Sequence, residues 1–276
     1  MHKCCKEVSS MRKFLVLFLS LAMVIACCSL ASAEAYTEQD ITIDAGDHQI
    51  PATLTLPEAV EGKTYPAVIM LHGNGSTRHE AGNAYDFAAP EMAKAGIATI
   101  RFDYIGNGDS TSDYIDFTYD KGVEDAMKCY DYLAALGTID MEHVGIMGWS
   151  QGGTDALLAA ARHPELFKSL VTWAGAPDLS SMLTDELYEE AKQNGYFVMS
   201  FDWRDSLNVS LQWCDDVANT DVLAEFAEGY TGPVLAIHGK EDTTVDPEWS
   251  NKIVAASKNE ASKTYFIEGM DHTFNV

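Results

Sequence analysis

A Gly-x-Ser-x-Gly motif lies between a strand pattern and a helix pattern in this chain, and few folds accommodate that combination. The motif occupies residues 148–152 (Gly-Trp-Ser-Gln-Gly). The largely apolar run 143–147 before it has the length of a strand, and residues 153–161 after it are dominated by Ala and Leu, which favour a helix. A serine on a sharp strand-to-helix turn needs glycines two residues to either side, because a Cβ there would crowd the backbone. The pattern predicts a nucleophile elbow with Ser150 at its tip.

A nucleophilic serine needs a base, and the base needs an acid that orients it. In a fold with this elbow both residues follow later in the chain, the acid first. One later apolar strand pattern leads into a loop with Asp242, and the next leads into a loop with His272. We therefore expect Asp242 to be the acid and His272 the base. Asp178 and Asp246 remain alternatives for the acid, since the first follows an earlier predicted strand and the second lies close to Asp242.

Backbone amides that stabilise an oxyanion are the fourth requirement of such a site. A buried strand pattern over residues 65–71 is followed by residues 72–75 (His-Gly-Asn-Gly). Two glycines after a central strand allow the backbone to approach a ligand closely. The expected donors are the amide of Asn74 and the amide of Gln151, the residue after the predicted nucleophile.

Strand and helix patterns alternate along the chain, which predicts one α/β domain with a mostly parallel central sheet and helices on both faces. The opening two strands are expected to form an antiparallel pair. The expected strands are 40–43, 49–56, 65–71, 97–102, 143–147, 170–174, 233–237 and 263–267. The expected helices are 84–95, 119–136, 153–161 and 247–258.

A long segment at about residues 177–231 interrupts this alternation after the sixth core strand. A crossover between neighbouring strands needs far fewer residues, so we expect an inserted cap over the carboxyl ends of the strands. The segment is rich in aromatic residues, most of which are expected to pack within the cap itself. We expect Trp203 and Trp213 from the cap, together with Trp149 beside the predicted nucleophile, to contact a substrate.

These motifs together resemble the α/β-hydrolase superfamily, and in particular its bacterial cinnamoyl/feruloyl esterase-like branch. The resemblance spans about residues 38–276 and is carried by residues 72–73, 101–104, 106–110, 148–153, 238–245 and 267–272. It implies that Ser150, Asp242 and His272 are nucleophile, acid and base. It also implies the same two oxyanion amides, but Trp149 stands where the branch usually has histidine and Asn74 where it commonly has an aromatic residue.

The resemblance further implies a final helix after the base. This sequence ends four residues after His272. Without that helix, we expect exposed apolar surface on the sheet and weak support for the His272 loop.

The first 33 residues have the pattern of a signal peptide. Basic residues precede an apolar run from 14 to about 30, and the run ends in Ala31-Ser32-Ala33, a small-residue cleavage site. This predicts a secreted protein whose hydrolase domain comprises residues 34–276. Residues 24–27 (Val-Ile-Ala-Cys) also resemble a bacterial lipobox, so a surface lipoprotein with a lipidated Cys27 is the alternative.

The composition restricts the partners of this protein. The chain has 18 Lys and Arg against 42 Asp and Glu, a formal net charge of −24. A chain with this net negative charge repels polyanions, and we therefore expect no nucleic-acid partner. We expect contact with a membrane only if Cys27 is lipidated. No metal-ligand spacing occurs, so we expect neither a metal nor another cofactor. Outside the predicted leader the cysteines are Cys129 and Cys214, and whether they pair is left open.

The function that these patterns favour is hydrolysis of small-molecule carboxylic esters through an acyl-enzyme. The resemblance favours aromatic acyl groups of the hydroxycinnamoyl or feruloyl type. The first alternative is a serine aminopeptidase or dipeptidyl-peptidase-like enzyme, which needs acidic groups to hold a substrate ammonium. The cap offers Glu189, Glu190, Asp215 and Asp216. The second alternative is a non-catalytic ligand-binding protein on the same scaffold, although such proteins usually lack a triad residue.

Overall fold

The computed structural model describes residues 36–274 of the 276-residue chain. The predicted signal peptide, its cleavage site and Cys27 lie outside the described residues. Across residues 36–274, no helix is both long enough and apolar enough to cross a membrane.

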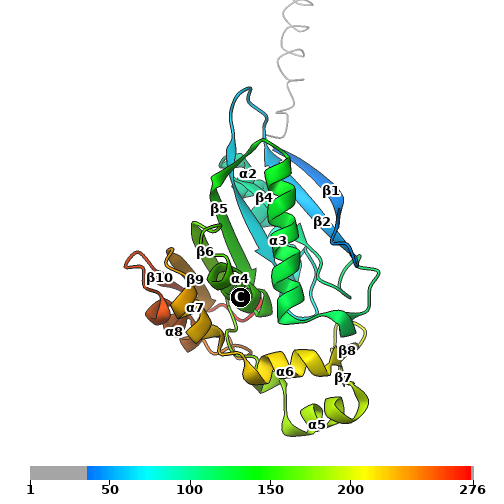
Figure 1. Ribbon diagram of the computed structural model, residues 1–276. Coiled ribbons are helices and arrows are strands. Elements are labelled where there is room, and N and C mark those ends of the chain that lie inside the picture. Colours follow the sequence, from blue (N-terminus) through cyan, green and yellow to red (C-terminus); the bar gives the residue numbers. More distant parts are fainter. Residues whose placement is uncertain (1–35, 275–276) are drawn as a thin grey trace, which may run out of the picture. The chain divides into compact units, whose positions relative to one another are not determined.

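An eight-stranded sheet forms the centre of the described part of the chain, in the order β1-β2-β4-β3-β5-β6-β9-β10 (Figure 1). β2 pairs antiparallel with β1 and β4, and every other neighbouring pair is parallel. The strands are β1 (Tyr36–Asp44), β2 (Gln49–Pro57), β3 (Tyr65–Leu71), β4 (Ala98–Phe102), β5 (Ile139–Trp149), β6 (Ser169–Trp173), β9 (Val234–Gly239) and β10 (Lys263–Ile267). The prediction of a mostly parallel sheet with an antiparallel opening pair is confirmed.

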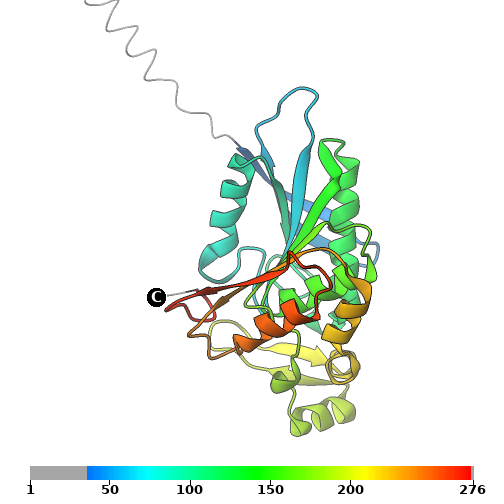
Figure 2. The same cartoon turned by 90° about the vertical axis from the view of Figure 1, so that its left-hand side faces the viewer.

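Helices cover both faces of this sheet, as the alternating pattern predicts. Figure 2 shows α2 on the opposite side of the sheet from α3. On the α3 side, α3, α4, α7 and α8 form a row in which each helix contacts the next. The helices are α2 (Ala84–Lys94), α3 (Tyr119–Ala135), α4 (Gln151–Arg162), α7 (Val222–Gly229) and α8 (Glu248–Ala256).

The local sequence explains why these helices form where they do. The chain enters α3 at Thr118, whose hydroxyl accepts a hydrogen bond of 3.1 Å from the amide of Lys121 and so caps the helix. The buried side chains of α3 recur every three or four residues and form one apolar stripe along the helix. The stripe comprises Val123, Ala126, Cys129 and Leu133. The inner strands read as continuous apolar runs because helices cover them on both faces.

Additional elements lie between β6 and β9. They are η3 (Ser180–Met182), α5 (Asp185–Asn194), β7 (Tyr196–Met199), β8 (Leu207–Ser210) and α6 (Leu211–Asn219). β7 and β8 form a separate antiparallel pair. Figure 1 shows α5, α6, β7 and β8 gathered at one end of the sheet.

The predicted cap boundary needs a correction, because α7 does not belong to these additional elements. α7 packs against α4, where Gly229 lies so close that a Cβ would be 2.3 Å from the carbonyl oxygen of Ala161. It is the helix that returns the chain from β6 to its parallel neighbour β9, which every such connection needs. The extra segment therefore covers about residues 177–220 rather than 177–231, and we call residues 177–220 the insert.

Candidate active site

Ser150 lies on a strained turn between β5 and α4. Its backbone has φ 53° and ψ −121°, a conformation that non-glycine residues rarely adopt. The flanking glycines permit this turn. A Cβ on Gly148 would lie 1.9 Å from the carbonyl oxygen of Gly152, and one on Gly152 would lie 2.3 Å from that of Leu71. The chain therefore forms the sharp elbow that the motif predicts, with the Ser150 side chain at its tip.

Ser150, His272 and Asp242 form one hydrogen-bonded chain in the structure. Nε2 of His272 lies 3.1 Å from Oγ of Ser150, and Nδ1 of His272 lies 2.7 Å from Oδ2 of Asp242. Asp242 follows β9 and His272 follows β10, which pair in parallel, so their loops meet at the same edge of the sheet. In this arrangement one imidazole nitrogen faces a hydroxyl and the other faces a carboxylate, which is the geometry of a serine nucleophile with its base and acid.

The buried carboxyl of Asp242 is surrounded by hydrogen-bond donors. Oδ1 accepts from the amides of Thr244 at 2.8 Å and Val245 at 2.9 Å, and Oδ2 also lies 3.0 Å from Nε2 of His238. Burial by itself raises the pKa of Asp242, but the hydrogen bonds from His238, His272 and Val245 outweigh it and hold this pKa well below its usual range. Asp242 is therefore ionised at neutral pH.

His238 was not among the predicted site residues. It is fully buried, and its Nδ1 lies 2.7 Å from Oγ of Ser250 on α8. The sequence signal was the His-Gly pair at the end of β9, four residues before Asp242. The imidazoles of His238 and His272 both contact Oδ2 of Asp242. This could not be predicted from the sequence, because the two histidines are 34 positions apart.

The two alternative acids line the same cavity as the triad but are hydrogen-bonded within their own loops. Oδ1 of Asp178 accepts a hydrogen bond of 2.8 Å from the amide of Ser180, and Oδ1 of Asp246 accepts one of 2.9 Å from the amide of Glu248. Each is thus engaged in its own loop. Nδ1 of His272 donates its hydrogen bond to Oδ2 of Asp242 instead.

The two predicted oxyanion amides border the same region. Asn74 follows β3 and lines a cavity together with Ser150, while Gln151 is the first residue of α4, directly after the elbow. Within residues 36–274, neither amide donates a hydrogen bond to another protein atom. The side chain of Asn74 turns towards the insert, where its Nδ2 lies 3.3 Å from Sδ of Met199.

Glu80 braces the loop that carries Asn74, and the sequence patterns did not single it out. Its Oε2 accepts a hydrogen bond of 2.8 Å from the amide of Gly73, and its Oε1 accepts one of 2.6 Å from Oγ of Ser76. Glu80 has φ 66° and is buried. Burial raises the pKa of its carboxyl to about 8, although the hydrogen bonds from Ser76 and Gly73 act in the opposite direction.

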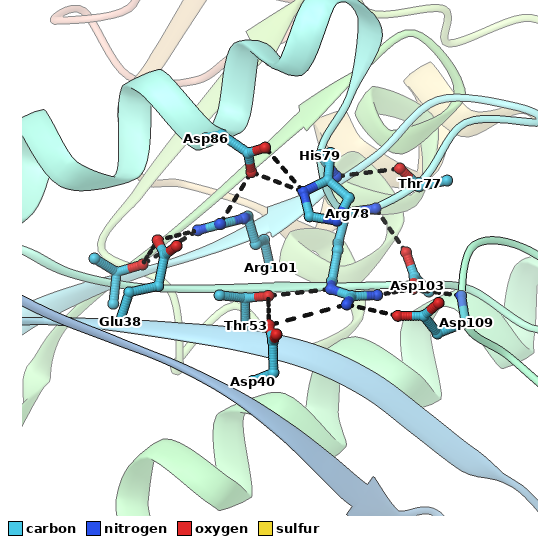
Figure 3. A network of polar contacts seen from close by, with 11 residues as sticks. Glu38, Asp40, Thr53, Thr77, Arg78, His79, Asp86, Arg101, Asp103 and Asp109 are labelled. Carbon is cyan, nitrogen blue, oxygen red and sulfur yellow. Dashed lines mark hydrogen bonds and ion pairs between the residues drawn. The ribbon is translucent and has the colours of Figure 1, made fainter.

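A polar network supports this loop from beneath (Figure 3). The buried carboxylate of Asp103, just after β4, accepts a 2.7 Å hydrogen bond from the amide of Arg78 and pairs with its guanidinium. The same guanidinium lies 2.7 Å from Asp109 and donates to Thr53 on β2 at 3.0 Å. Figure 3 also shows Arg101 beside Glu38 and Asp86. The motif at residues 101–110 is therefore a structural brace between the sheet and the loops around the site.

Two cavities flank the triad. The first, of about 530 Å³, is lined by Ser150 and by apolar side chains from the insert and α8. These side chains include Leu179, Met182, Phe201, Trp203 and Trp249. The second, of about 1100 Å³, is more polar and includes Ser76, Thr77, Glu80, Arg204 and Asp205. Both cavities share Trp149 and His272 on their walls.

The three tryptophans predicted to contact a substrate have different positions. Trp149 and Trp203 line both cavities, and Trp203 is 71% exposed. Trp213 is 0% exposed and packs 6.3 Å from the ring of Phe197 inside the insert. The prediction for Trp213 is wrong, because a side chain buried between α6 and β7 cannot reach a ligand. The expectation that insert aromatics pack on one another holds for Phe197 and Trp213.

Cys129 and Cys214 are both buried free thiols, so they do not pair in this structure. In the described part of the chain, no group of three or more His, Cys, Asp or Glu side chains is arranged to hold a metal ion.

Comparisons with solved structures agree with this fold. Est1E from Butyrivibrio proteoclasticus, solved with ferulic acid bound, superposes with a TM-score of 0.69 at 24% identity, covering 85% of this chain and 92% of that chain. A hypothetical protein from Pseudomonas aeruginosa superposes with a TM-score of 0.71 at 20% identity, covering 87% and 88%.

Relatives found by sequence are covered to different extents by this chain. The 2-hydroxy-6-oxo-6-(2'-aminophenyl)hexa-2,4-dienoic acid hydrolase of Metapseudomonas resinovorans is 26% identical over 220 residues, which cover 70% of this chain and 73% of the relative. The 2,6-dihydropseudooxynicotine hydrolase of Paenarthrobacter nicotinovorans is 28% identical over 197 residues, 70% of this chain and 48% of the relative. Two proteins of Mycobacterium tuberculosis match at 29% identity over 143 residues, and this chain spans only 31% of their length.

The fold matches that of these solved structures, and the family match that follows confirms the superfamily expected from the motifs, the α/β-hydrolases. The chain matches the model of the prolyl oligopeptidase family over residues 83–273, more than half of its length. Within the α/β-hydrolases, this protein therefore belongs to the prolyl oligopeptidase family.

Proposed function

We propose that this protein is a serine carboxylic-ester hydrolase that works through an acyl-enzyme. The observation that carries the proposal is the hydrogen-bonded chain from Ser150 through His272 to Asp242, with distances of 3.1 Å and 2.7 Å. Ser150 attacks the ester carbonyl while His272 takes its proton and passes it to the leaving alcohol. A water molecule, deprotonated by His272, then hydrolyses the acyl-enzyme. Asp242 fixes the His272 tautomer and stabilises the imidazolium.

The oxyanion that forms in each step is stabilised by the amides of Asn74 and Gln151. The N-terminus of α4, where Gln151 lies, adds a favourable field for negative charge. Removal of one such donor typically costs about 3 kcal/mol of transition-state stabilisation.

The proposed substrates are esters of aromatic acids of the hydroxycinnamoyl type. The cavity beside Ser150 has about 530 Å³ and is lined by Phe201, Trp203 and Trp249, which suits a planar apolar group. The similar fold of Est1E, solved with ferulic acid bound, supports the same acyl class. Burial of an aryl ring in such a cavity contributes roughly 25 cal/mol for each Å² removed from water.

We also propose that the protein is secreted after cleavage of residues 1–33. The support for this is the sequence pattern alone, and lipidation at Cys27 is the alternative. The mature protein would act on small-molecule esters outside the cell without a nucleic-acid, metal or cofactor requirement.

A peptidase is the second candidate, because the family match is to prolyl oligopeptidases. The four acidic residues that the sequence offered for holding a substrate ammonium line neither of the two cavities; they are Glu189, Glu190, Asp215 and Asp216. Two other carboxylates, Asp178 and Asp246, do line the 530 Å³ cavity. A substrate with an amino terminus would therefore meet these two residues.

The test compares three substrates on the full chain and on Ser150→Ala. p-Nitrophenyl acetate, methyl ferulate and an aminoacyl p-nitroanilide are assayed, and labelling by a fluorophosphonate probe is measured. We expect both esters to be hydrolysed, the probe to label the wild type, and Ser150→Ala to lose about 10⁴-fold or more in kcat with unchanged circular dichroism. The exposed Ser180→Ala serves as the matched control and should behave as the wild type.

Each other outcome identifies a different function. Near-normal ester turnover by Ser150→Ala would remove Ser150 from the mechanism. Faster cleavage of the anilide than of methyl ferulate would identify a peptidase. Absence of both labelling and turnover in the wild type would favour the non-catalytic binding protein.

A further inference from the structure

Arg204, in the insert, binds the backbone of two loops that border the proposed active site. Its Nη1 donates to the carbonyl oxygen of Gly75 at 2.9 Å, and its Nη2 donates to that of Gly106 at 3.4 Å. Nη1 also donates to the side-chain oxygen of Asn107. One side chain of the insert thus ties together the loop after β3 and the loop after β4.

The insert covers the same loop with an aromatic ring. The ring of Phe201 lies so close to Gly75 that a Cβ there would be 2.9 Å from it, and the guanidinium of Arg204 lies 5.9 Å from the centre of that ring. Gly75 directly follows Asn74, the proposed oxyanion donor. The loop is therefore held on one side by Glu80, through Gly73 and Ser76, and on the other by the insert.

Within the described part of the chain, no ion pair neutralises the charge of Arg204. Among the arginines of residues 36–274, Arg78, Arg101 and Arg162 each have a carboxylate oxygen within 4.0 Å, whereas Arg204 binds only carbonyl and amide oxygens. Burial lowers the pKa of its guanidinium, with Tyr114 and Asp205 acting against this, but an arginine stays protonated at neutral pH. Arg204 also lines the 1100 Å³ cavity that His272 borders.

We propose that Arg204 is a positioning residue for the oxyanion loop. Its guanidinium holds the Gly75 carbonyl so that the preceding Asn74 amide stays directed at the oxyanion, and its positive charge adds a favourable field there. This inference rests on the serine mechanism proposed above and extends it. The insert then contributes to kcat even for a substrate that is too small to contact it.

The experiment compares Arg204→Lys and Arg204→Ala with the wild type, using p-nitrophenyl acetate. Lysine keeps the charge but cannot bind several carbonyl oxygens in one plane. We expect kcat to fall about 10-fold for Arg204→Lys and about 100-fold for Arg204→Ala, with KM within about twofold, since the loss is in the transition state. Arg162→Lys is the matched control, because Arg162 pairs with Glu225 and Asp120 on the surface, and its kcat should not change.

Fluorophosphonate labelling separates positioning from folding. In both Arg204 variants the reaction should reach the same final labelling per chain as the wild type, at a lower rate. A final labelling that falls in proportion to kcat would mean that fewer chains are folded, and would overturn the proposal. Unchanged kcat in both variants, or a loss confined to KM, would also overturn it. Failure of the serine mechanism itself looks different, since the wild type would then not be labelled at Ser150, and the positioning proposal would fall with it.

Discussion

The indole Nε1 of Trp149 donates a hydrogen bond of 3.0 Å to the carbonyl oxygen of His272, and the two rings lie 4.7 Å apart. Trp149, which precedes the proposed nucleophile, thus contacts both the backbone and the imidazole ring of His272, the proposed base. We expected weak support for the His272 loop, and this contact from Trp149 at the end of β5 is one support that the structure provides. It also gives a physical reason for tryptophan at a position where the resembling branch usually has histidine.

Trp149→Phe tests that support. Phenylalanine keeps a ring against His272 but cannot donate the hydrogen bond, which is typically worth about 0.5 to 1.5 kcal/mol. We expect kcat for p-nitrophenyl acetate to fall about 3- to 10-fold while the thermal midpoint changes little. Trp173→Phe, on the neighbouring strand β6, should leave kcat unchanged. Equal kcat values for Trp149→Phe and the wild type would show that the base needs no such support.

The choice of acid is tested by three matched substitutions. Asp242→Asn should lower kcat by about 10³- to 10⁴-fold, because His272 loses the partner that fixes its tautomer. Asp178→Asn and Asp246→Asn should each change the kcat for p-nitrophenyl acetate by less than about threefold, since these carboxylates are engaged in their own loops. If Asp178→Asn were the crippling change, the acid would follow β6 and our assignment would be wrong.

The aromatic wall of the 530 Å³ cavity is expected to determine acyl preference. Trp203→Ala should lower kcat/KM for methyl ferulate by about 10-fold, because a bulky aryl group gains its binding free energy from apolar burial. Acetate has little area to bury, so p-nitrophenyl acetate should change by less than about twofold. Trp213→Phe is the control: it should lower the free energy of unfolding without changing the ratio between the two esters. Equal losses for both esters in Trp203→Ala would leave the aromatic-acyl proposal without support from the cavity.

A buried acid in the nucleophile helix is expected to make stability depend on pH. Asp155 on α4 is fully buried beside Tyr104 and Gln151, and within the described residues neither of its carboxyl oxygens has a hydrogen-bond partner within 3.5 Å. Burial raises the pKa of Asp155 to about 8, partly opposed by Tyr104, Arg162 and Gln151. The folded state thus binds this proton more tightly than the unfolded state, where the pKa is 3.8. The free energy of unfolding should therefore fall as pH rises from about 4 to 8.

Asp155→Asn removes this titration while keeping the size of the side chain. We expect the variant to be more stable than the wild type by about 1 to 3 kcal/mol at pH 8, with a smaller difference at pH 5. Denaturant unfolding at several pH values measures the difference. Glu80 titrates over a similar range but is present in both proteins, so its effect cancels. A difference that does not vary between pH 5 and pH 8 would contradict the prediction.

The order and bounds of the core elements and the location of the site could be predicted from the sequence, because both follow from local patterns. Apolar runs and helical stripes predict strands and helices to within a few residues, as α3 and β3 illustrate. Parallel strands bring their carboxyl ends to one edge of the sheet. Residues that follow β5, β9 and β10 therefore meet. His272 lies within hydrogen-bonding distance of both Ser150 and Asp242.

Which side chains surround these three residues depends on tertiary packing and could not be predicted from the sequence. Trp203 lies in the loop between β7 and β8 and lines the cavity, whereas Trp213 on α6 is buried beside Phe197 of β7. His238, Glu80 and Arg204 act through contacts that join residues on separate loops and elements. Such contacts leave no periodic pattern in the sequence. They depend on how the insert and the loops pack against the sheet, and not on the secondary-structure preference of any one segment.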